Sequence, residues 1–184
     1  MIFEEQDISL ILKALRFSSE KHKDQRRKGA EGLPYINHPI DVAETLWTAG
    51  GVRDVNVIVA AILHDTVEDT GTTPAELEEQ FGAMVRSLVQ EVTDDKRLPK
   101  PERKRLQVEH APHLSPGAKQ IKLADKISNI NDVAYSPPAD WPHQRRVDYL
   151  AWADSVVSGL RGSNQKLEEL FDEVLARARM AVAG

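Results

Sequence analysis

The stretch VNVIVAAIL, residues 55–63, is almost entirely apolar and is followed at once by HDTVED, residues 64–69. A helix that is apolar on nearly every side is buried on every side. Asp54 stands where its carboxylate can accept hydrogen bonds from the free N–H groups of the first turn. We therefore predict a central buried helix that begins after Asp54 and continues through HDTVED.

Helical periodicity continues through the rest of the chain. Apolar residues recur at helical spacing in residues 4–23, whereas QRRKGAEGLPYINHP, residues 25–39, has two Gly and two Pro and is expected to be largely a loop. Further helices are expected at about 39–48, 74–81, 83–95, 101–112, 115–136, 142–161 and 163–181. The chain has no alternating strand pattern of length and no repeat. It predicts an all-α fold, one domain of about eight to ten helices over residues 1–184.

Composition limits the functional classes. The chain has 184 residues, no Cys and a formal net charge of −5. Without Cys it has no disulfide, thiolate metal ligand or Cys nucleophile, which fits a reducing compartment. No apolar run approaches the roughly 20 residues that cross a bilayer, and the acidic N-terminus is unlike a signal peptide. We expect a cytoplasmic protein without membrane or general nucleic-acid binding.

The motif HDTVED gathers four ionisable side chains: His64, Asp65, Glu68 and Asp69. On a continuous helix, His64 and Glu68 share one face, and Asp65 and Asp69 share the adjacent face. Buried carboxylates without partners are costly. A divalent cation removes that cost, because His nitrogen and Asp oxygen are good ligands. The alternative is a helix end that emerges into solvent, where the same residues are simply polar.

Two further residues favour the metal interpretation. His38 stands in the tight PYINHP segment before a predicted helix, and Asp125 stands in IKLADKISN, on an otherwise apolar face. With His64 and Asp65 they supply two imidazoles and two carboxylates from three helical regions. Such a set leaves coordination positions open for water and substrate. Taken singly, His38 can be a helix cap, and Asp125 can pair with one of the lysines beside it in KLADK.

Together these motifs resemble the HD metal-dependent phosphohydrolases. More narrowly, they resemble the hydrolase domain of the RelA/SpoT family, which removes the 3′-pyrophosphate from (p)ppGpp, and within it the small stand-alone enzymes, among them the metazoan SpoT homologue. The resemblance covers nearly the whole chain through QRRKGAEGLPYINHP, AAILHDTVEDT, FGAMVRSLVQEVTDDK, LPKPERKRLQVEHAP, SPGAKQIKLADKISN and GLRGSNQKLEE. It implies a single HD hydrolase domain without the synthetase and regulatory domains of the long members, and hence degradation only.

The resemblance also implies roles for the acidic and imidazole residues. One set is expected to bind a single Mn²⁺ ion: His38, His64, Asp65 and Asp125. Ligand chemistry alone does not distinguish Mn²⁺ from Fe²⁺, Co²⁺ or Zn²⁺. Such an ion acidifies a water molecule, which attacks phosphorus. Glu68 and Asp69, the catalytic pair in the family, then hold and deprotonate that water.

Two basic stretches, residues 21–28 and 96–105, are candidates for binding the phosphates, although charge runs are usually solvated faces. A net acidic protein needs such local cations to hold a substrate with two pyrophosphates. By the resemblance, Arg27 stacks on the base, which suits a guanidinium. Lys28 contacts the phosphate side, and Asn129, four residues after Asp125, lies near the ribose.

Three more residues correspond to the phosphate end and the pocket wall in the small enzymes: Lys100, Arg145 and Tyr149. For Tyr149, packing in the core beside its apolar neighbours is an equal alternative. The chain also departs from the family pattern, because Asn131 stands where an Arg is usual, two residues after Asn129. No ion pair or phosphate contact is therefore expected at position 131.

The sequence thus predicts a Mn²⁺-dependent 3′-pyrophosphohydrolase that converts ppGpp or pppGpp to GDP or GTP plus pyrophosphate. A second interpretation keeps the metal chemistry and removes a ribose phosphate from another nucleotide, such as NADPH. A third is a nucleotide sensor that binds without cleaving. Glu68 and Asp69 argue against the sensor, because a pure binder needs no spare acid–base pair. The sequence leaves the formation of a homo-oligomer open.

Overall fold

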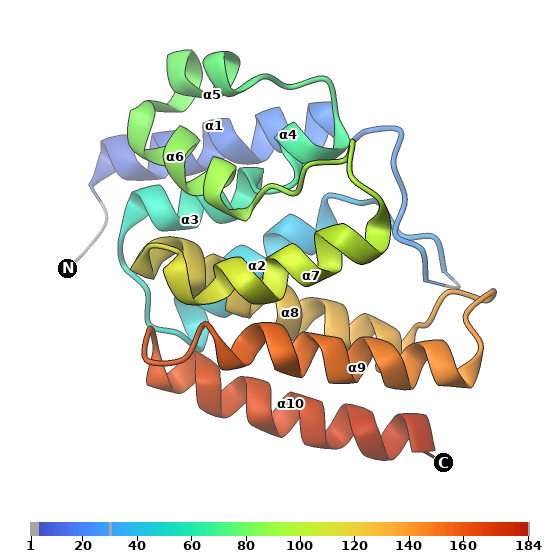
Figure 1. Cartoon of the computed structure of the whole chain (residues 1–184). Helices are drawn as coiled ribbons and strands as arrows, with labels where there is room; N and C mark the ends of the chain where they lie inside the picture. The colour runs from blue at the N-terminus through green and yellow to red at the C-terminus, as the bar shows by residue number, and fades with distance from the viewer. Residues whose placement is uncertain (1–3, 30, 184) are drawn as a thin grey trace.

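The computed structural model describes residues 4–29 and 31–183, and within these ranges the regular structure is helical apart from one isolated bridge between Arg26 and Pro34 (Figure 1). The helices are α1 (Glu5–Lys21), α2 (Asn37–Thr48), α3 (Val55–Leu63), α4 (Thr66–Asp69), α5 (Pro74–Phe81), α6 (Ala83–Val92), α7 (Lys100–His110), η1 (Ala111–His113), α8 (Pro116–Tyr135), α9 (His143–Ser158) and α10 (Gln165–Ala183). The predicted all-α fold is confirmed. No described helix is long and apolar enough to cross a membrane.

Helix α3 is the centre of the fold, as its sequence predicts. It contacts α1, α2, α6 and α8, and residues 57–63 are all buried. The carboxylate of Asp54 accepts a hydrogen bond from the N–H of Asn56 at 2.9 Å, which confirms the predicted N-cap. Because the buried residues 57–63 are all apolar, α3 can present polar groups to the interior only at its ends. Its C-terminal end is where HDTVED begins.

The prediction of one continuous helix through HDTVED is wrong. Helix α3 ends at Leu63, and Thr66–Asp69 form the separate short helix α4. Side chains replace the continuing backbone hydrogen bonds: His64 Nδ1 donates to the carbonyl of Ala61 at 2.7 Å, and Thr66 Oγ1 donates to that of Leu63 at 2.6 Å. Such local bonds compete with helix propagation. These two hydrogen bonds place His64 and Asp65 in a turn between α3 and α4. The expectation that they share helix faces with Glu68 and Asp69 therefore does not hold.

Helix α8 is the second interior helix. Its N-cap Ser115 accepts a hydrogen bond from the N–H of Ala118, with Pro116 in the first turn. Residues 121–128 are buried without interruption. Helix α8 contacts α2, α3, α6, α9 and α10. Because α2, α3 and α8 touch one another, the residues His38, His64 and Asp125 meet in the interior although they are far apart in sequence.

The connection from α2 to α3 is shaped by two glycines. Gly51 has a φ of +63°, a conformation that favours glycine. At Gly50, an added Cβ would lie 2.9 Å from Cγ of Leu167, so the backbone there passes close to α10. The amide of Asn164 donates to the carbonyl of Gly50 at 2.9 Å. Helices α9 and α10, which run antiparallel along one side of the molecule (Figure 1), are thereby tied to the helices that carry the site.

Helix α10 should contribute strongly to stability through Phe171, which is fully buried against the common core. We expect Phe171→Ala to lower the free energy of unfolding by about 3–5 kcal/mol, because the substitution leaves a cavity. Urea unfolding followed by circular dichroism measures the change. The control is Met180→Ala on the same helix, where the side chain is 68% exposed and little change is expected. Equal stabilities for the two variants would contradict the packing described.

Candidate active site

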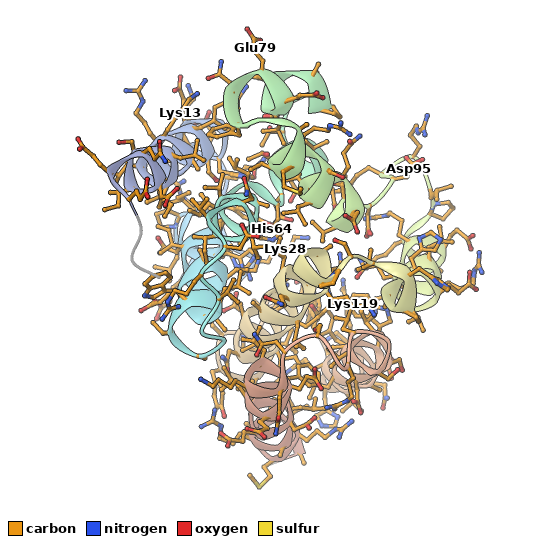
Figure 2. All side chains as sticks on the ribbon, turned by 90° about the vertical axis from the view of Figure 1, so that its left-hand side faces the viewer. Lys13, Lys28, His64, Glu79, Asp95 and Lys119 are labelled. Atoms are coloured by element: carbon orange, nitrogen blue, oxygen red, sulfur yellow. The ribbon has the colours of Figure 1, made fainter. Side chains whose placement is uncertain are left out.

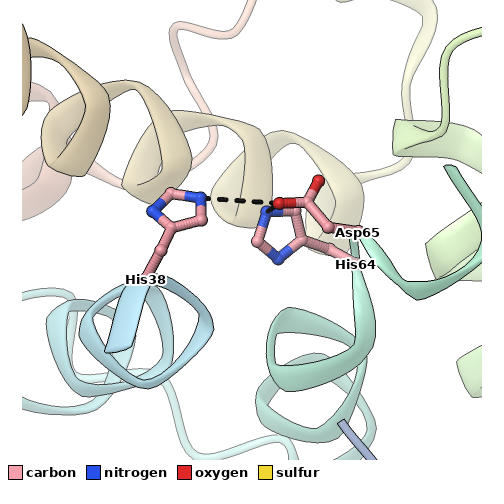
Figure 3. A group of neighbouring side chains, drawn as sticks. All are labelled: His38, His64 and Asp65. Carbon is pink, nitrogen blue, oxygen red and sulfur yellow. Dashed lines mark ion pairs between the residues drawn. The ribbon is translucent and has the colours of Figure 1, made fainter. Parts of the chain in front are cut away.

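Three of the predicted metal ligands converge where α2 meets the turn after α3. His38 Nε2 lies 3.7 Å from Asp65 Oδ2, and His64 Nε2 lies 3.1 Å from the same oxygen. The donor atoms of these three residues all lie within 4.8 Å of one another (Figure 3). A cluster of two imidazoles and one carboxylate at this spacing can hold a divalent metal ion.

Asp125 approaches the same cluster from α8. Its Oδ1 atom lies 3.3 Å from His38 Nε2 and 3.9 Å from His64 Nε2. Its Oδ2 atom forms an ion pair with Lys126 at 2.9 Å, and Asn129 donates a hydrogen bond to Oδ1. Asp125 therefore pairs with a lysine and approaches the imidazoles at the same time, because the two contacts use different oxygen atoms.

Hydrogen bonds at Nδ1 fix which imidazole nitrogen faces the cluster. The carbonyl of Ala61 can only accept, so the bond with His64 Nδ1 places a proton on that nitrogen. His38 Nδ1 lies 3.0 Å from the hydroxyl of Ser128. His64 Nε2 is buried and faces Asp65 Oδ2 at 3.1 Å. A histidine anchored through one nitrogen, with the other turned toward the remaining donors of the cluster, fits a metal ligand.

Without an ion, the cluster balances its charge internally. Burial opposes a charge on His64, but Asp65 and then Asp125 outweigh it and raise the pKa of His64 to about 9. Burial also opposes ionisation of Asp65, yet His64 and His38 hold the pKa of that carboxyl well below its ordinary value. For Asp125, Lys126 and the imidazoles likewise outweigh burial and lower the pKa. The site therefore favours a positive charge between the two carboxylates.

Glu68 and Asp69 lie beside this cluster on α4. Burial raises the pKa of Glu68 above its ordinary value, although the carboxylate accepts a hydrogen bond from the N–H of Asp94 at 2.9 Å. Asp69 is paired with Lys96, whose Nζ also lies 3.5 Å from Glu68. Glu68 is thus a carboxyl with a raised pKa, and Asp69 is a carboxyl paired with a lysine.

Every residue that the sequence proposes for the site lines one cavity of about 620 Å³. Those residues are Arg27, Lys28, His38, His64, Asp65, Glu68, Asp69, Lys100, Asp125, Asn129, Arg145 and Tyr149. His64 lies in the interior, whereas Glu79 and Asp95 stand at the periphery (Figure 2). Asn131 is not among the described residues that line the cavity.

Arg27 is held beside Asn129 by a set of polar contacts. Its Nε donates to Asp132 Oδ2 at 2.9 Å, and its Nη2 donates to both Asp132 and Asn129. The guanidinium carbon lies 5.5 Å from the centre of the Tyr35 ring. The loop that carries Arg27 doubles back on itself, because the Arg27 N–H donates to Leu33 and the Tyr35 N–H donates to Gln25. This turn brings Arg27 to the wall of the cavity.

A second group of residues that line the cavity is strongly basic. Burial lowers the pKa of Lys100, and the nearby charges of Arg145, Lys28 and Arg103 lower it further. Cations that repel one another in this way form a site for an anion. Trp141 provides an apolar floor, with its ring centre 4.4 Å from the Arg145 guanidinium and 5.9 Å from Lys100 Nζ. One cavity therefore joins an acidic, imidazole-rich end to a cationic end.

Comparison with known proteins assigns this arrangement to a family. The family model described as HD domain matches residues 14–151. The chain belongs to the HD domain family. Two relatives, from Xenopus tropicalis and Homo sapiens, are both named guanosine-3′,5′-bis(diphosphate) 3′-pyrophosphohydrolase MESH1. Each is 54% identical to this chain, over 96% and 94% of it and 98% and 96% of their own lengths.

A solved structure agrees with these relatives. It is described as a metazoan ortholog of SpoT that hydrolyzes ppGpp and plays a role in starvation responses. It matches with a TM-score of 0.91 and 42% identity, and the match covers 96% of this chain and 98% of the other. The family resemblance indicated by the sequence motifs is thereby confirmed.

Within this HD domain, the basic run at residues 96–105 divides between the site and the surface. Four of its cations line the cavity: Lys96, Lys100, Arg103 and Lys104. Arg105 instead pairs with Glu102 and Glu109 on the exposed face of α7, as an ordinary solvated helix does. The sequence does not separate the two groups, because α7 has no buried residue to mark its inner face.

Tyr149 fits both of its proposed roles. Its ring centre lies 5.6 Å from that of Trp141 and 5.3 Å from that of Trp152, and the ring packs against the hydrophobic core. Burial raises the pKa of its hydroxyl to about 12. The same residue lines the cavity. Core packing and a place in the pocket wall are therefore compatible at this position.

Sequence reasoning missed Tyr35. Its hydroxyl donates to Asp65 Oδ2 at 2.7 Å and lies 3.3 Å from Asp69 Oδ2. Tyr35 stands in PYINHP, three residues before His38, so the motif contains it. Nothing in the sequence places its hydroxyl against HDTVED, because that contact depends on the fold of the loop.

Metal-free protein should lose stability as the pH rises through the range in which His64 titrates. The folded pKa of about 9 lies above the unfolded value of about 6.5, so the ion pair stabilises the fold fully below pH 6.5 and is lost by about pH 9. Urea unfolding in the presence of a chelator measures this slope. We expect His64→Gln to remove this contribution, and His143→Gln, at an exposed position, to keep it. Parallel slopes for wild type and His64→Gln would contradict the charge balance.

Proposed function

We propose that the chain is a Mn²⁺-dependent 3′-pyrophosphohydrolase, which hydrolyses ppGpp or pppGpp to GDP or GTP plus pyrophosphate. One observation carries the proposal: a single cavity joins the His–Asp cluster to a group of cations, in a chain that is 54% identical to proteins named for that activity. A nucleotide with phosphates at two positions matches such a cavity, since one phosphate group can lie at each end.

The metal site is proposed to use two imidazoles and two carboxylates: His38, His64, Asp65 and Asp125. The buried Nε2 of His64, which faces the cluster, and the short separation of the donor atoms of His38, His64 and Asp65 support this set. When bound, a divalent ion supplies Lewis-acid chemistry, activating water and polarising a phosphoryl oxygen. Mn²⁺ is proposed on the family resemblance, because the donor set by itself suits several divalent metals.

Proton transfer is assigned to Glu68 and Asp69. The raised pKa of Glu68 suits a group that takes a proton from water at neutral pH and returns it to the leaving oxygen. Asp69, paired with Lys96, is proposed to orient the water. The ammonium of Lys96 lies between the two carboxylates and limits their mutual repulsion.

Substrate binding is assigned to the remaining residues of the cavity. Arg27 is proposed to stack on the base and Asn129 to lie near the ribose, which agrees with their contact with each other at 2.9 Å. The other phosphate group is assigned to the basic end of the cavity, to Lys28, Lys100 and Arg145. Tyr149 is proposed to close the wall beside them.

The remaining expectations from the sequence also stay proposals. Residues 1–184 are proposed to form one hydrolase domain that acts in the cytoplasm without nucleic acid. The described helices of residues 4–29 and 31–183 pack on one core, which is consistent with a single domain.

The division of labour between metal ligands and the acid pair predicts two different losses. Asp65→Ala should abolish bound metal and turnover together. Glu68→Gln should lower kcat by about 100-fold or more while metal stays bound, because the residue moves a proton and binds no metal. Elemental analysis gives the metal content, and steady-state assays give kcat. The matched control is Glu79→Gln, at an exposed position. Metal loss in Glu68→Gln would contradict this division.

Arg27 is predicted to act mainly in binding. Arg27→Ala should raise KM by about tenfold or more with a smaller change in kcat, because it removes a stacking contact with the base that is made equally in the ground state and the transition state. Arg16→Ala, on the exposed side of α1, serves as the control. An unchanged KM would argue against a role at the base.

The activity itself is tested by the product. Purified protein given ppGpp and Mn²⁺ should release pyrophosphate and GDP, and EDTA should stop the release. Faster release of orthophosphate from NADPH would favour the alternative ribose phosphatase. Tight binding of ppGpp with no turnover in any divalent metal would favour the sensor. Either result would replace the proposed activity.

A further inference from the structure

We infer that Tyr35, His22 and Gln25 form a positioning layer at the wall of the site, which holds the metal-binding Asp65 and the acid–base residue Asp69 in register; Tyr35 and Gln25 themselves line the cavity. The inference rests on the proposed function and deepens it. Tyr35 and Gln25 contact these groups directly, and His22 contacts Tyr35 and Gln25.

Tyr35 joins the two carboxylates directly. Its hydroxyl donates to Asp65 Oδ2, the same oxygen that faces both imidazoles, and lies 3.3 Å from Asp69 Oδ2. A hydrogen bond to a metal-ligating carboxylate fixes the direction of its remaining lone pair. The Tyr35 hydroxyl therefore sets the distance between Asp65, a proposed metal ligand, and Asp69, a member of the acid pair. These two residues are four positions apart in the chain.

The ring of Tyr35 is itself held in place. It stacks on the imidazole of His22 with the ring centres 4.8 Å apart and an angle of 27° between the planes. His22 is 2% exposed, at the C-terminal cap of α1. The Tyr35 N–H donates to the carbonyl of Gln25 at 3.1 Å. Both the ring and the backbone of Tyr35 are thus anchored to the segment that follows α1.

Gln25 closes the layer onto Asp69. Its Nε2 donates to the backbone carbonyl of Asp69 at 2.7 Å, and its Oε1 lies 2.7 Å from His22 Nδ1. A carbonyl only accepts, so the amide orientation is fixed, and Oε1 must accept from His22 Nδ1–H. The other ring nitrogen of His22, Nε2, is buried without a hydrogen-bond partner. The three side chains form one consistent chain of donors and acceptors.

Helix α4 needs such support from outside. It spans Thr66–Asp69 only and ends at an extended Thr70, and a helix of one turn has little stability of its own. Its last carbonyls lack helical partners, and Gln25 supplies a partner to that of Asp69. An error of about 1 Å in the place of a catalytic group can reduce turnover by about 100-fold. The layer therefore has a mechanistic consequence beyond stability.

The experiment compares Tyr35→Phe with Tyr135→Phe, a matched control at a 62% exposed position. Titration with Mn²⁺ alone measures the metal dissociation constant, and hydrolysis of ppGpp measures kcat and KM. We expect Tyr35→Phe to weaken Mn²⁺ binding by about 10- to 100-fold and to lower kcat by at least about tenfold. Its KM should change by less than about threefold. Wild-type Mn²⁺ affinity and kcat in Tyr35→Phe would overturn the inference.

A second variant separates positioning from stability. Gln25→Glu keeps the size of the side chain but cannot donate to the carbonyl of Asp69. It should lower kcat by about tenfold and leave Mn²⁺ affinity within about threefold, because it touches no metal ligand. Unchanged kcat would overturn the role of Gln25, and this holds even if Tyr35→Phe fails to fold. If wild type does not cleave ppGpp, the proposed function fails, whereas the Mn²⁺ titrations still decide the role of Tyr35.

Discussion

Two carboxylates, the half-buried Asp65 and the buried Asp125, face the same pair of imidazoles, and the rest of the site depends on the charge that lies between them. Carboxylates taken out of water without a counter-charge would be strongly destabilising. In the described arrangement the counter-charge comes from protonated His64 and from Lys126, as the raised pKa of His64 indicates. A divalent cation placed between the same donors replaces that proton and supplies the chemistry. The folded protein thus keeps a place for a cation whether or not a metal is bound.

The fold creates this place by burying one helix on every side and ending it in the interior. Helix α3 is enclosed by α1, α2, α6 and α8, and its terminal carbonyls are satisfied by the side chains of His64 and Thr66. The same hydrogen bonds that end the helix orient the His64 ring toward the cluster. Local structure and metal-site geometry are therefore fixed by the same atoms. The cations of the cavity come mainly from other elements, α7, α9 and the loop after α1.

Much of this could be predicted from the sequence, because burial of VNVIVAAIL and the identity of the HD motif are local properties. The cap at Asp54, the all-α fold and the location of the proposed residues around one cavity agree with the structure. The break after Leu63 could not be predicted from periodicity, because it depends on side chains that compete with the backbone. The contacts of Tyr35 with HDTVED and of Lys96 with Asp69 depend on loops whose path is set by tertiary packing. For Asp125, the sequence suggests either a lysine partner or the imidazoles. The structure has both contacts, because each uses a different carboxylate oxygen.

The most direct test of the account is the position of the metal. Crystals grown with Mn²⁺ and measured for anomalous scattering should show one ion per chain, within about 2.5 Å of Nε2 of His38, Nε2 of His64 and carboxylate oxygens of Asp65 and Asp125. Glu68 and Asp69 should remain outside that coordination shell. An ion held by Glu68 or Asp69, or a site in which Asp125 stays on Lys126 and contributes no ligand, would contradict the central claim.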